Sequence, residues 1–484
     1  MKQNDARNLT MVMDLYEMTM SNGYFNNGNK DSRVAFDVFY RRNPDDGGFA
    51  IFAGLEQIVE YIENLKFSKE DVDYFRRLNL FNEEFLKYLE DFRFKGDLYA
   101  FPEGTIMYPN EPVLTVVAPL IDAQLVETAI LLQVNHQSLI ATKTRRIVKA
   151  AGKRAVSDFG ARRAHNMDAA VYGARAAYIG GAVGSATVLA GQMFDMPVSG
   201  TMAHSWVMFY EDEFEAFKNY AINYPDATVL LVDTYDVLES GIPNAIRCAK
   251  EVLEPMGKRL LGIRLDSGDL AYLSKQARKM LDAAGLNDCK VVVSNSLDEY
   301  TITSILNQGG MIDSFGVGER LITAKSDPVF GAVYKMAAVE ENGKFEPRIK
   351  ISENVEKITN PGLKKVYRIY DEEGKSVADL LARSEDCVDL SKPYRFVEPE
   401  RPWKNRYFEN FTAKELQVQI IKDGKLVYDL PTLEEIKKYV SDQLENEVWE
   451  EEQRFENPHT HYMDMSPELY EVKMNLLHQS RKSE

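Results

Sequence analysis

Five short apolar runs, each ending in polar or charged residues, constrain the fold of this chain more than any other feature. They lie at residues 154–159, 228–233, 261–266, 290–294 and 314–318. Helical stretches separate several of them, for example at residues 242–253 and 271–284. Continuously apolar strands that alternate with helices are typical of a parallel sheet covered on both faces. The middle of the chain is therefore predicted to be an α/β domain.

Polar residues and glycines mark the carboxyl ends of these runs. They are Asp158, Asp233, Arg264, Asp266, Ser294, Asn295, Gly316 and Gly318. In a barrel of parallel strands, the carboxyl ends and the loops after them build the active site. An open doubly wound sheet would use the same ends, beside one crevice. We favour a barrel because so many strand ends carry such residues.

The 484 residues favour more than one domain, because single hydrophobic cores stop growing well below that length. We expect an N-terminal α+β domain at residues 1–135, the α/β domain at 136–340, and a C-terminal region of strands and then helices at 341–484. Outside the five runs, strands are predicted at residues 34–40, 96–118 (several short ones), 365–370 and 416–421, and helices at 67–92, 135–151 and from 432 onward.

Composition excludes some classes of function. The formal net charge is −17, which argues against general nucleic-acid binding because that needs a basic surface. No apolar run approaches the roughly 20 residues that cross a bilayer, and the N-terminus lacks a signal-peptide pattern. The cysteines, Cys248, Cys289 and Cys387, are far apart, so we expect free thiols in a reducing cytoplasm.

Positive charge is nevertheless concentrated early in this acidic chain. Four basic clusters precede residue 165, at residues 41–42, 143–146, 153–154 and 162–163. Such clusters favour a site for small anions such as phosphates. Scattered surface charge is the competing interpretation, and the pattern alone does not decide between them.

Two local motifs suggest chemistry. His204 lies in a segment of small and polar residues, Ser199 to Ser205, which would leave a ring nitrogen accessible for nucleophilic work. Residues 264–269 combine an arginine, carboxylates and a glycine, which suits phosphate and ribose binding. The alternatives are a packed or surface histidine and a salt-bridged loop.

In this order along the chain, the motifs resemble the nicotinate phosphoribosyltransferase family of type II phosphoribosyltransferases. The resemblance spans about residues 8–370. The blocks that carry it are residues 8–10, 14–17, 36–37, 41–42, 101–104, 158–165, 200–205, 233–236, 264–269 and 316–318.

The resemblance implies an irregular, TIM-like α/β barrel joined to a second α+β domain, which is built from the N-terminal segment and part of the C-terminal region. It implies a cytoplasmic homodimer. It also implies that nicotinate, phosphoribosyl pyrophosphate (PRPP), ATP and water give nicotinate mononucleotide, pyrophosphate, ADP and phosphate, with Mg²⁺ bound through substrate phosphates and water. No nucleic acid or membrane partner is expected.

The same resemblance assigns roles to residues. His204 is similar to the histidine that takes a phosphoryl group from ATP, and Asp266 to a ligand of the ribose hydroxyls. The other expected contacts are Tyr16 and Phe159 on the two faces of the pyridine ring, Arg162 and Arg264 as phosphate and carboxylate clamps, Thr201 on nicotinate, and Ser294, Asn295, Gly316 and Gly318 around the 5′-phosphate.

Two alternative functions stay open at this point. A related nicotinamide enzyme places an aspartate against the substrate amide, whereas residues 183–187 here contain no acid, which favours nicotinate. A catalytically silent, nucleotide-binding homologue would be expected to lose His204 or the Arg264–Asp266 pair, and this chain keeps both. The tail from residue 432, with His459, His461 and His478, shows no motif that indicates a role.

Overall fold

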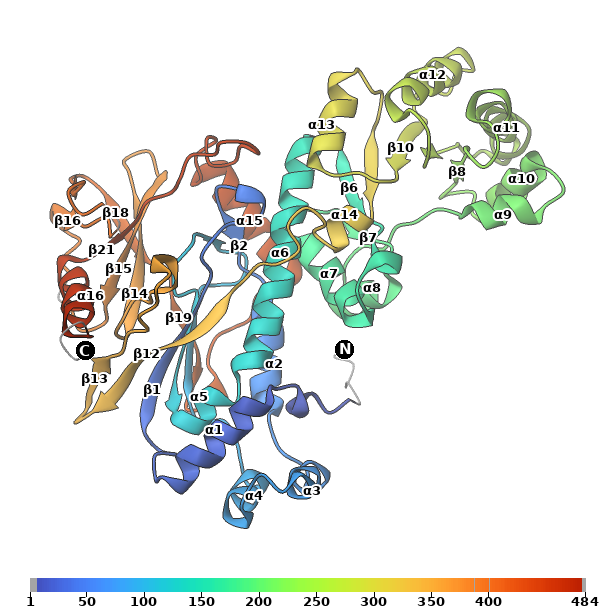
Figure 1. The fold of residues 1–484 in the computed structure, drawn as a ribbon. Coiled ribbons are helices and arrows are strands. Elements are labelled where there is room, and N and C mark those ends of the chain that lie inside the picture. Colours follow the sequence, from blue (N-terminus) through green and yellow to red (C-terminus); the bar gives the residue numbers. More distant parts are fainter. Residues whose placement is uncertain (1–6, 387, 400, 481–484) are drawn as a thin grey trace. The chain divides into compact units, whose positions relative to one another are not determined.

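A computed structural model describes residues 7–386, 388–399 and 401–480 of the chain (Figure 1). These residues divide into two compact units. The middle unit comprises residues 140–328, and the two-segment unit comprises residues 7–139 and 329–480. Cys248 and Cys289 are free and buried, as expected, whereas Cys387 lies outside the described residues.

The middle unit is built on a six-stranded sheet with the order β7-β6-β11-β10-β9-β8, in which every pairing is parallel. The strands are β6 (Ala155–Asp158), β7 (Gly184–Ser185), β8 (Val229–Leu231), β9 (Gly262–Leu265), β10 (Lys290–Ser294) and β11 (Ser314–Val317). Five of them coincide with the five apolar runs. The two-residue strand β7 was not predicted, because it is too short to leave a pattern.

Helices connect these strands, as the alternating pattern predicts. They are α7 (Met167–Ile179), α8 (Val188–Phe194), α9 (His204–Phe209), α10 (Glu213–Asn223), α11 (Ile242–Cys248), α12 (Leu270–Ala283), α13 (Glu299–Asn307) and α14 (Glu319–Ile322). Asp269 and Asp298 cap α12 and α13 by accepting backbone N–H groups. Among the described strands, no pairing joins β7 to β8, so the sheet is parallel as expected but a closed barrel is not formed by these pairs.

The two-segment unit is dominated by antiparallel sheets. A seven-stranded sheet has the order β13-β12-β1-β5-β3-β19-β20, and a four-stranded sheet has the order β18-β14-β15-β21. The strands of the first are β1 (Arg33–Phe39), β3 (Asp97–Ala100), β5 (Leu114–Pro119), β12 (Val333–Glu341), β13 (Lys344–Pro347), β19 (Val418–Lys422) and β20 (Lys425–Leu426). Those of the second are β14 (Lys364–Tyr370), β15 (Ser376–Arg383), β18 (Thr412–Glu415) and β21 (Met463–Met465).

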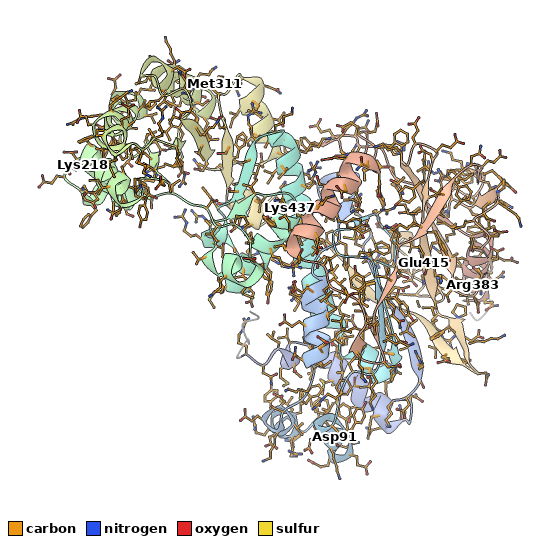
Figure 2. The ribbon with its side chains drawn as sticks, turned by 180° about the vertical axis from the view of Figure 1, so that it is seen from behind. Asp91, Lys218, Met311, Arg383, Glu415 and Lys437 are labelled. Atoms are coloured by element: carbon orange, nitrogen blue, oxygen red, sulfur yellow. The ribbon has the colours of Figure 1, made fainter. Side chains whose placement is uncertain are left out.

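The seven-stranded sheet draws on both segments of this unit, because β1 pairs with β12 and β3 pairs with β19. Two small pairs complete the strands, β2 (Ala50–Ile51) with β4 (Ile106–Met107) and β16 (Tyr394–Phe396) with β17 (Arg406–Phe408). The edge strand β18 carries Glu415, labelled in Figure 2, which forms an ion pair at 3.1 Å with Lys365 of the neighbouring strand β14.

The helices of the two-segment unit are α1 (Leu15–Asn26), α2 (Leu55–Asn64), α3 (Lys69–Leu78), α4 (Glu83–Glu90), α5 (Leu120–Gln124), α15 (Leu433–Asn446) and α16 (Pro467–Ser480). The helix predicted at residues 67–92 is two helices, because Asn79 ends α3 in a left-handed conformation and Asn82 caps α4.

The boundary between the units falls within α6 (Glu127–Ala151), which begins eight residues before its predicted start at Asn135. None of the helices in the described part of the chain combines the length and apolarity needed to span a membrane.

Candidate active site

Adjacent strands β9 and β10 bring the predicted arginine and its partners together. Arg264 lies opposite Val292 in the parallel register. Side chains two residues apart along a strand share a face, so Asp266 follows Arg264, and Ser294 follows Val292, on one side. Arg264 Nε donates to Ser294 Oγ at 2.9 Å, and Nη2 donates to Asp266 Oδ1 at 2.9 Å. Ser294 Oγ also hydrogen-bonds to the same Asp266 oxygen.

The Arg264 guanidinium is held at all three of its nitrogens. Its third hydrogen bond runs from Nη1 to Thr201 Oγ1 at 3.0 Å. The guanidinium carbon also lies 5.4 Å from the centroid of the Phe159 ring, within the range of a cation–π contact. Because only 14% of its side chain is exposed, Arg264 is fixed before any ligand binds. The sequence predicted Arg264, Asp266, Ser294, Thr201 and Phe159 as site residues, and the structure brings these five together.

His204 is the first residue of α9 and faces the same cluster. Its Nδ1 lies 3.1 Å from Thr234 Oγ1, and its Nε2 lies 3.8 Å from Asp266 Oδ2. About 40% of the His204 side chain is exposed. A histidine that is oriented by a hydroxyl on one side, lies near a carboxylate on the other and stays open to solvent can act as a nucleophile or exchange a proton.

Asp233, two residues beyond the end of β8, supports the loop that carries Asp266. Its Oδ2 accepts a hydrogen bond from the Asp266 backbone N–H at 2.9 Å and another from Ser267 Oγ at 2.6 Å. Its Oδ1 is buried and has no hydrogen-bond partner among the described residues. Asp233 therefore shapes the loop and leaves one carboxylate oxygen unused.

Phe159 directly follows β6, and Gly316 of the neighbouring strand β11 makes room for its ring. A Cβ on Gly316 would lie 2.4 Å from one ring carbon of Phe159, which is closer than real Cβ contacts allow. The absence of a side chain at Gly316 thus lets the aromatic ring lie against the strand. Asp158, just before it, accepts from the Gly160 N–H at 2.8 Å and from Ser185 Oγ at 2.7 Å. Burial raises the pKa of Asp158, against the effect of these two bonds.

The loops after β10 and β11 are neighbours in the sheet. Asn295 and Ser296 both adopt left-handed backbone conformations, with φ of +83° and +52°. Both residues thus lie in a tight turn, and consecutive backbone N–H groups in turns are common anion contacts. Gly318 precedes the single turn α14, and a Cβ there would lie 3.2 Å from the Phe159 carbonyl oxygen. These loops are compatible with the predicted phosphate contacts.

Two predicted residues are not part of this cluster: Arg162 makes no contact with it in the described residues, and Tyr16 belongs to the other unit. Arg162 is exposed in a 3₁₀ turn, Ala161–Arg163, and makes no hydrogen bond or ion pair with another described residue. Tyr16 lies on α1 of the two-segment unit, with 43% of its surface exposed. Their predicted contacts with substrate stay predictions.

Part of the basic cluster at residues 143–146 has a structural role instead of the suggested phosphate binding. Lys143 Nζ lies 2.9 Å from the Glu299 carboxylate, and Arg146 Nε donates to it at 2.8 Å. Both cations are nearly buried and Glu299 is fully buried. A buried carboxylate needs such partners, so these two charges are committed to the interior of the middle unit.

The sequence marked Asp233 as a strand-end residue and residues 233–236 as a block of the resemblance, but it gave no role to Asp233 or Thr234. Thr234 directly follows Asp233, so the same strand-end rule could have suggested it as a site residue. The contact of Thr234 with His204, however, joins a loop residue to the first residue of α9, 30 positions away along the chain. Such a contact depends on how the loops fold and leaves no local signal.

Comparisons with known proteins show the family to which the chain belongs. Three family profiles match consecutive parts of the chain: the nicotinate phosphoribosyltransferase N-terminal domain at residues 11–135, the nicotinate phosphoribosyltransferase family at 154–373, and the nicotinate phosphoribosyltransferase C-terminal domain at 363–473. Together they cover most of both units.

Relatives extend over nearly the whole chain. Nicotinate phosphoribosyltransferase of Bacillus subtilis is 47% identical over 97% of this chain and 96% of its own length, and the human enzyme is 30% identical over 88% and 89%. The crystal structure of human nicotinic acid phosphoribosyltransferase superposes with a TM-score of 0.84 and 27% identity, covering 96% of this chain and all of that one. Nicotinate-nucleotide pyrophosphorylase from Pyrococcus furiosus gives a TM-score of 0.67 at 25% identity, over 92% and 99%. The chain belongs to the nicotinate phosphoribosyltransferase family.

Proposed function

We propose that this protein joins nicotinate to the phosphoribosyl group of PRPP, giving nicotinate mononucleotide and pyrophosphate, and that ATP assists through a phosphohistidine at His204. One observation carries the proposal: His204 Nε2 faces Asp266 Oδ2 at 3.8 Å, while Asp266 is held by Arg264 and Ser294. An accessible histidine thus lies beside a fixed carboxylate and a fixed cation, in a chain of this family.

In the glycosyl-transfer step, the pyridine nitrogen attacks C1 of the ribose while the bond to pyrophosphate breaks. The nitrogen lone pair makes the new bond, and the pyrophosphate oxygen keeps the electron pair of the old one. Positive charge develops on the ribose, which a nearby carboxylate stabilises. Asp266 supplies that carboxylate in the proposal, and its partners Arg264 and Ser294 hold it in place without reorganisation during the reaction.

In the ATP-dependent step, a ring nitrogen of His204 takes the γ-phosphoryl group and ADP leaves. Water later cleaves the N–P bond and releases phosphate, so atoms balance over the cycle. Thr234 on Nδ1 and Asp266 near Nε2 restrict the imidazole to one orientation. The doubly charged phosphoryl group would then stand beside the loops that bind PRPP and would favour their ordered form.

Two carboxylates of the site fit Mg²⁺, which prefers oxygen ligands and keeps several waters. Asp233 Oδ1 is buried and unpaired within the described residues, and 30% of the Asp266 side chain is exposed. The ion is proposed to bind through oxygens of substrate phosphates and water, and the Asp266 carboxylate would reach it only through water. When bound, Mg²⁺ would offset the negative charge that grows on the departing pyrophosphate.

The pyridine ring is proposed to lie against Phe159, with Thr201 and the arginines toward its carboxylate. The stacking of Phe159 on Gly316 supports this assignment, because it fixes one ring face in place. Arg162 is proposed as a phosphate or carboxylate clamp because its guanidinium is exposed and uncommitted among the described side chains. The irregular barrel, the homodimer and the cytoplasmic setting belong to the same proposal.

The choice of nicotinate over nicotinamide rests on residues 183–187. This segment contains no aspartate or glutamate. Its buried Ser185 donates a hydrogen bond to Asp158, and its exposed Ala186 has no polar side chain. A carboxylate at such a position would repel nicotinate and accept a hydrogen bond from an amide. The segment is therefore suited to the acid.

A two-substrate assay tests the proposal. Purified protein receives PRPP, Mg²⁺ and either nicotinate or nicotinamide, with and without ATP. The variants are His204→Ala and the matched control His478→Ala, which removes an exposed histidine of α16. We expect nicotinate mononucleotide, a strong increase with ATP, and loss of that increase in His204→Ala alone. Turnover of nicotinamide instead would transfer the chain to the related amide enzyme, and no product with either base would favour a silent homologue.

A further inference from the structure

A charged pair ties together the two segments that follow strands β10 and β11. Asp298 directly precedes α13, and Arg320 is the second residue of α14. Arg320 Nη1 donates a hydrogen bond to Asp298 Oδ2 and another, at 3.3 Å, to Thr301 Oγ1. The two strands are parallel neighbours in the sheet of the middle unit, so the pair bridges two adjacent strand ends.

The bridged segments carry the residues expected around the 5′-phosphate of the ribose. Only residues 295–297 separate β10 from Asp298, and Gly318 alone separates β11 from α14. Asn295 and Ser296 are exposed and lie in the tight turn described above. Because these connections are so short, a shift of either helix start would move a predicted phosphate contact with it.

The Asp298 carboxylate is held at both of its oxygens. Oδ1 accepts the Thr301 backbone N–H at 2.8 Å and caps α13, while Oδ2 accepts from Arg320. Burial alone would raise the pKa of Asp298, but the Thr301 hydrogen bonds and Arg320 outweigh it and leave that pKa below its usual value. The side chains are only 16% and 35% exposed, so this pair is more firmly fixed than an ordinary surface ion pair.

A second connection joins the same two segments on their buried side. Glu299, the first residue of α13, pairs with Lys143 at 2.9 Å, and Lys143 Nζ donates to Ser326 Oγ, beyond α14, at 2.7 Å. Lys143 and Glu299 are both buried, whereas Arg320 reaches solvent. The interior contacts thus maintain the fold of the two segments, and the Asp298–Arg320 pair fixes their outer side. Removing the outer pair should therefore loosen the strand-end segments without unfolding the unit.

We propose that the Asp298–Arg320 pair is a positioning pair that holds the two segments in the form that binds the 5′-phosphate of PRPP. This inference rests on the proposed function, with the 5′-phosphate bound by the residues that follow β10 and β11. Without the pair, binding would have to order these segments, and their loss of conformational freedom would weaken it. Both residues act through the segments and not by touching the substrate.

Asp298→Asn tests the charge of the pair and keeps the cap, because asparagine caps helices as well as aspartate does. Ordering one or two residues on binding corresponds to about five- to tenfold in a binding constant, so the KM for PRPP should rise by about that factor. The KM for nicotinate should stay within about twofold, since its expected contacts lie elsewhere.

Two inhibitors separate the ends of PRPP. Ribose 5-phosphate carries the 5′-phosphate, so its inhibition constant against PRPP should rise in Asp298→Asn by the same factor as the KM for PRPP. Pyrophosphate lacks that phosphate and should keep its inhibition constant within about twofold. A role in stability alone would not move one constant and spare the other.

Arg320 supplies the second arm of the test. Arg320→Gln should match Asp298→Asn, and the two effects should not add in the double variant, because both remove one ion pair. Arg320→Lys should retain most of the wild-type KM for PRPP, since a single nitrogen of Arg320 makes both contacts and an ammonium can replace it. Asp288→Asn is the matched control: Asp288 pairs with Arg259 and joins the segments before β9 and β10, at the opposite strand ends.

The experiment uses the full-length protein, with kcat, both KM values, both inhibition constants and thermal unfolding measured for every variant. Wild type that forms no nicotinate mononucleotide would overturn the proposed function and the positioning role with it. Active wild type, with an Asp298→Asn variant whose KM for PRPP is unchanged, would overturn only the positioning role. So would full additivity in the double variant, or an equal rise of both inhibition constants.

A large effect of Arg320→Gln beside none of Asp298→Asn would also overturn the positioning role and would make Arg320 a direct phosphate ligand. Should Asp298→Asn fail to fold, the comparison of Arg320→Gln with Arg320→Lys still decides, because only the former removes the positive charge.

Discussion

Replacing His461 with phenylalanine should lower the thermal stability of this protein markedly, although His461 lies in the tail for which the sequence indicated no role. His461 is 7% exposed and stacks on Tyr108, with ring centroids 3.6 Å apart and an interplanar angle of 7°. Its Nδ1 lies 3.2 Å from Glu452 Oε1, and its Nε2 lies 3.5 Å from Asp379 Oδ2. The imidazole therefore separates two buried carboxylates.

The substitution removes the two nitrogens and keeps a stacked ring. Each carboxylate keeps one further partner: Asp379 accepts two bonds from Arg368 at 2.9 and 2.8 Å, and Glu452 accepts the Tyr108 hydroxyl at 2.8 Å. Breaking a buried ion pair by removing one partner costs about 3–5 kcal/mol, and the remaining partners favour the lower end. At about 2 °C per kcal/mol for a large domain, the melting temperature should fall by about 6 °C.

The sign of the pH dependence gives a second check. Burial alone would lower the pKa of His461, but the Asp379 and Glu452 carboxylates outweigh it and raise that pKa. A group whose folded pKa is raised stabilises fully below its unfolded pKa, about 6.5 for histidine, and loses this effect as pH rises through the folded value. The difference in stability between wild type and His461→Phe should therefore be larger at pH 6 than at pH 9.

Thermal unfolding followed by calorimetry at both pH values measures this difference. His459→Phe is the control, because His459 lies two residues away and is exposed. A fall of less than 2 °C for His461→Phe, or a difference that does not shrink as pH rises, would refute the reasoning. It would mean that the two carboxylates are satisfied by Arg368 and Tyr108 without the imidazole.

Two further substitutions test the active site. Gly316→Ala would bring a Cβ to 2.4 Å from the Phe159 ring, so the ring must move. We expect the enzyme to fold but its kcat/KM for nicotinate to fall by about tenfold or more. An unchanged kcat/KM in steady-state kinetics would contradict the stacking assignment. In Arg264→Lys, the lysine cannot reproduce three simultaneous hydrogen bonds to Ser294, Thr201 and Asp266. The kcat should therefore fall by about 100-fold. Retention of more than half of the wild-type kcat would show that a simple cation suffices.

The predictions from sequence succeeded where the determining interactions are local along the chain. The apolar runs gave β9, β10 and β11 to within one residue, because a buried parallel strand needs a continuous apolar stretch. Arg264 and Asp266 could be expected on one face because they are two residues apart at the end of a predicted strand, residues 261–266. The resemblance to the family then supplied roles that no pattern of spacing contains.

Other features escaped prediction because they depend on contacts between distant segments. The His461 cluster draws Tyr108, Arg368, Asp379 and Glu452 from widely separated parts of the chain, and no periodicity links them. The role of Gly316 was predicted as a phosphate contact, yet its missing side chain also accommodates Phe159 from the adjacent strand. A glycine in a strand indicates that another group lies close to the backbone there, but it does not identify that group.

The basic residues of this acidic chain differ in burial: some are enclosed in ion pairs and others are exposed. Their clustering in the sequence did not distinguish the two groups. Lys143 and Arg146 are enclosed with Glu299, so withdrawing either would leave a buried carboxylate short of a partner. Arg264 is held just as firmly but keeps part of its surface open, and Arg162 is exposed. Phosphate and pyrophosphate groups of a substrate can be bound only by cationic side chains that are not already buried in ion pairs. The phosphate-binding hypothesis for the basic clusters therefore no longer includes Lys143 and Arg146, whereas Arg162 stays a predicted phosphate contact.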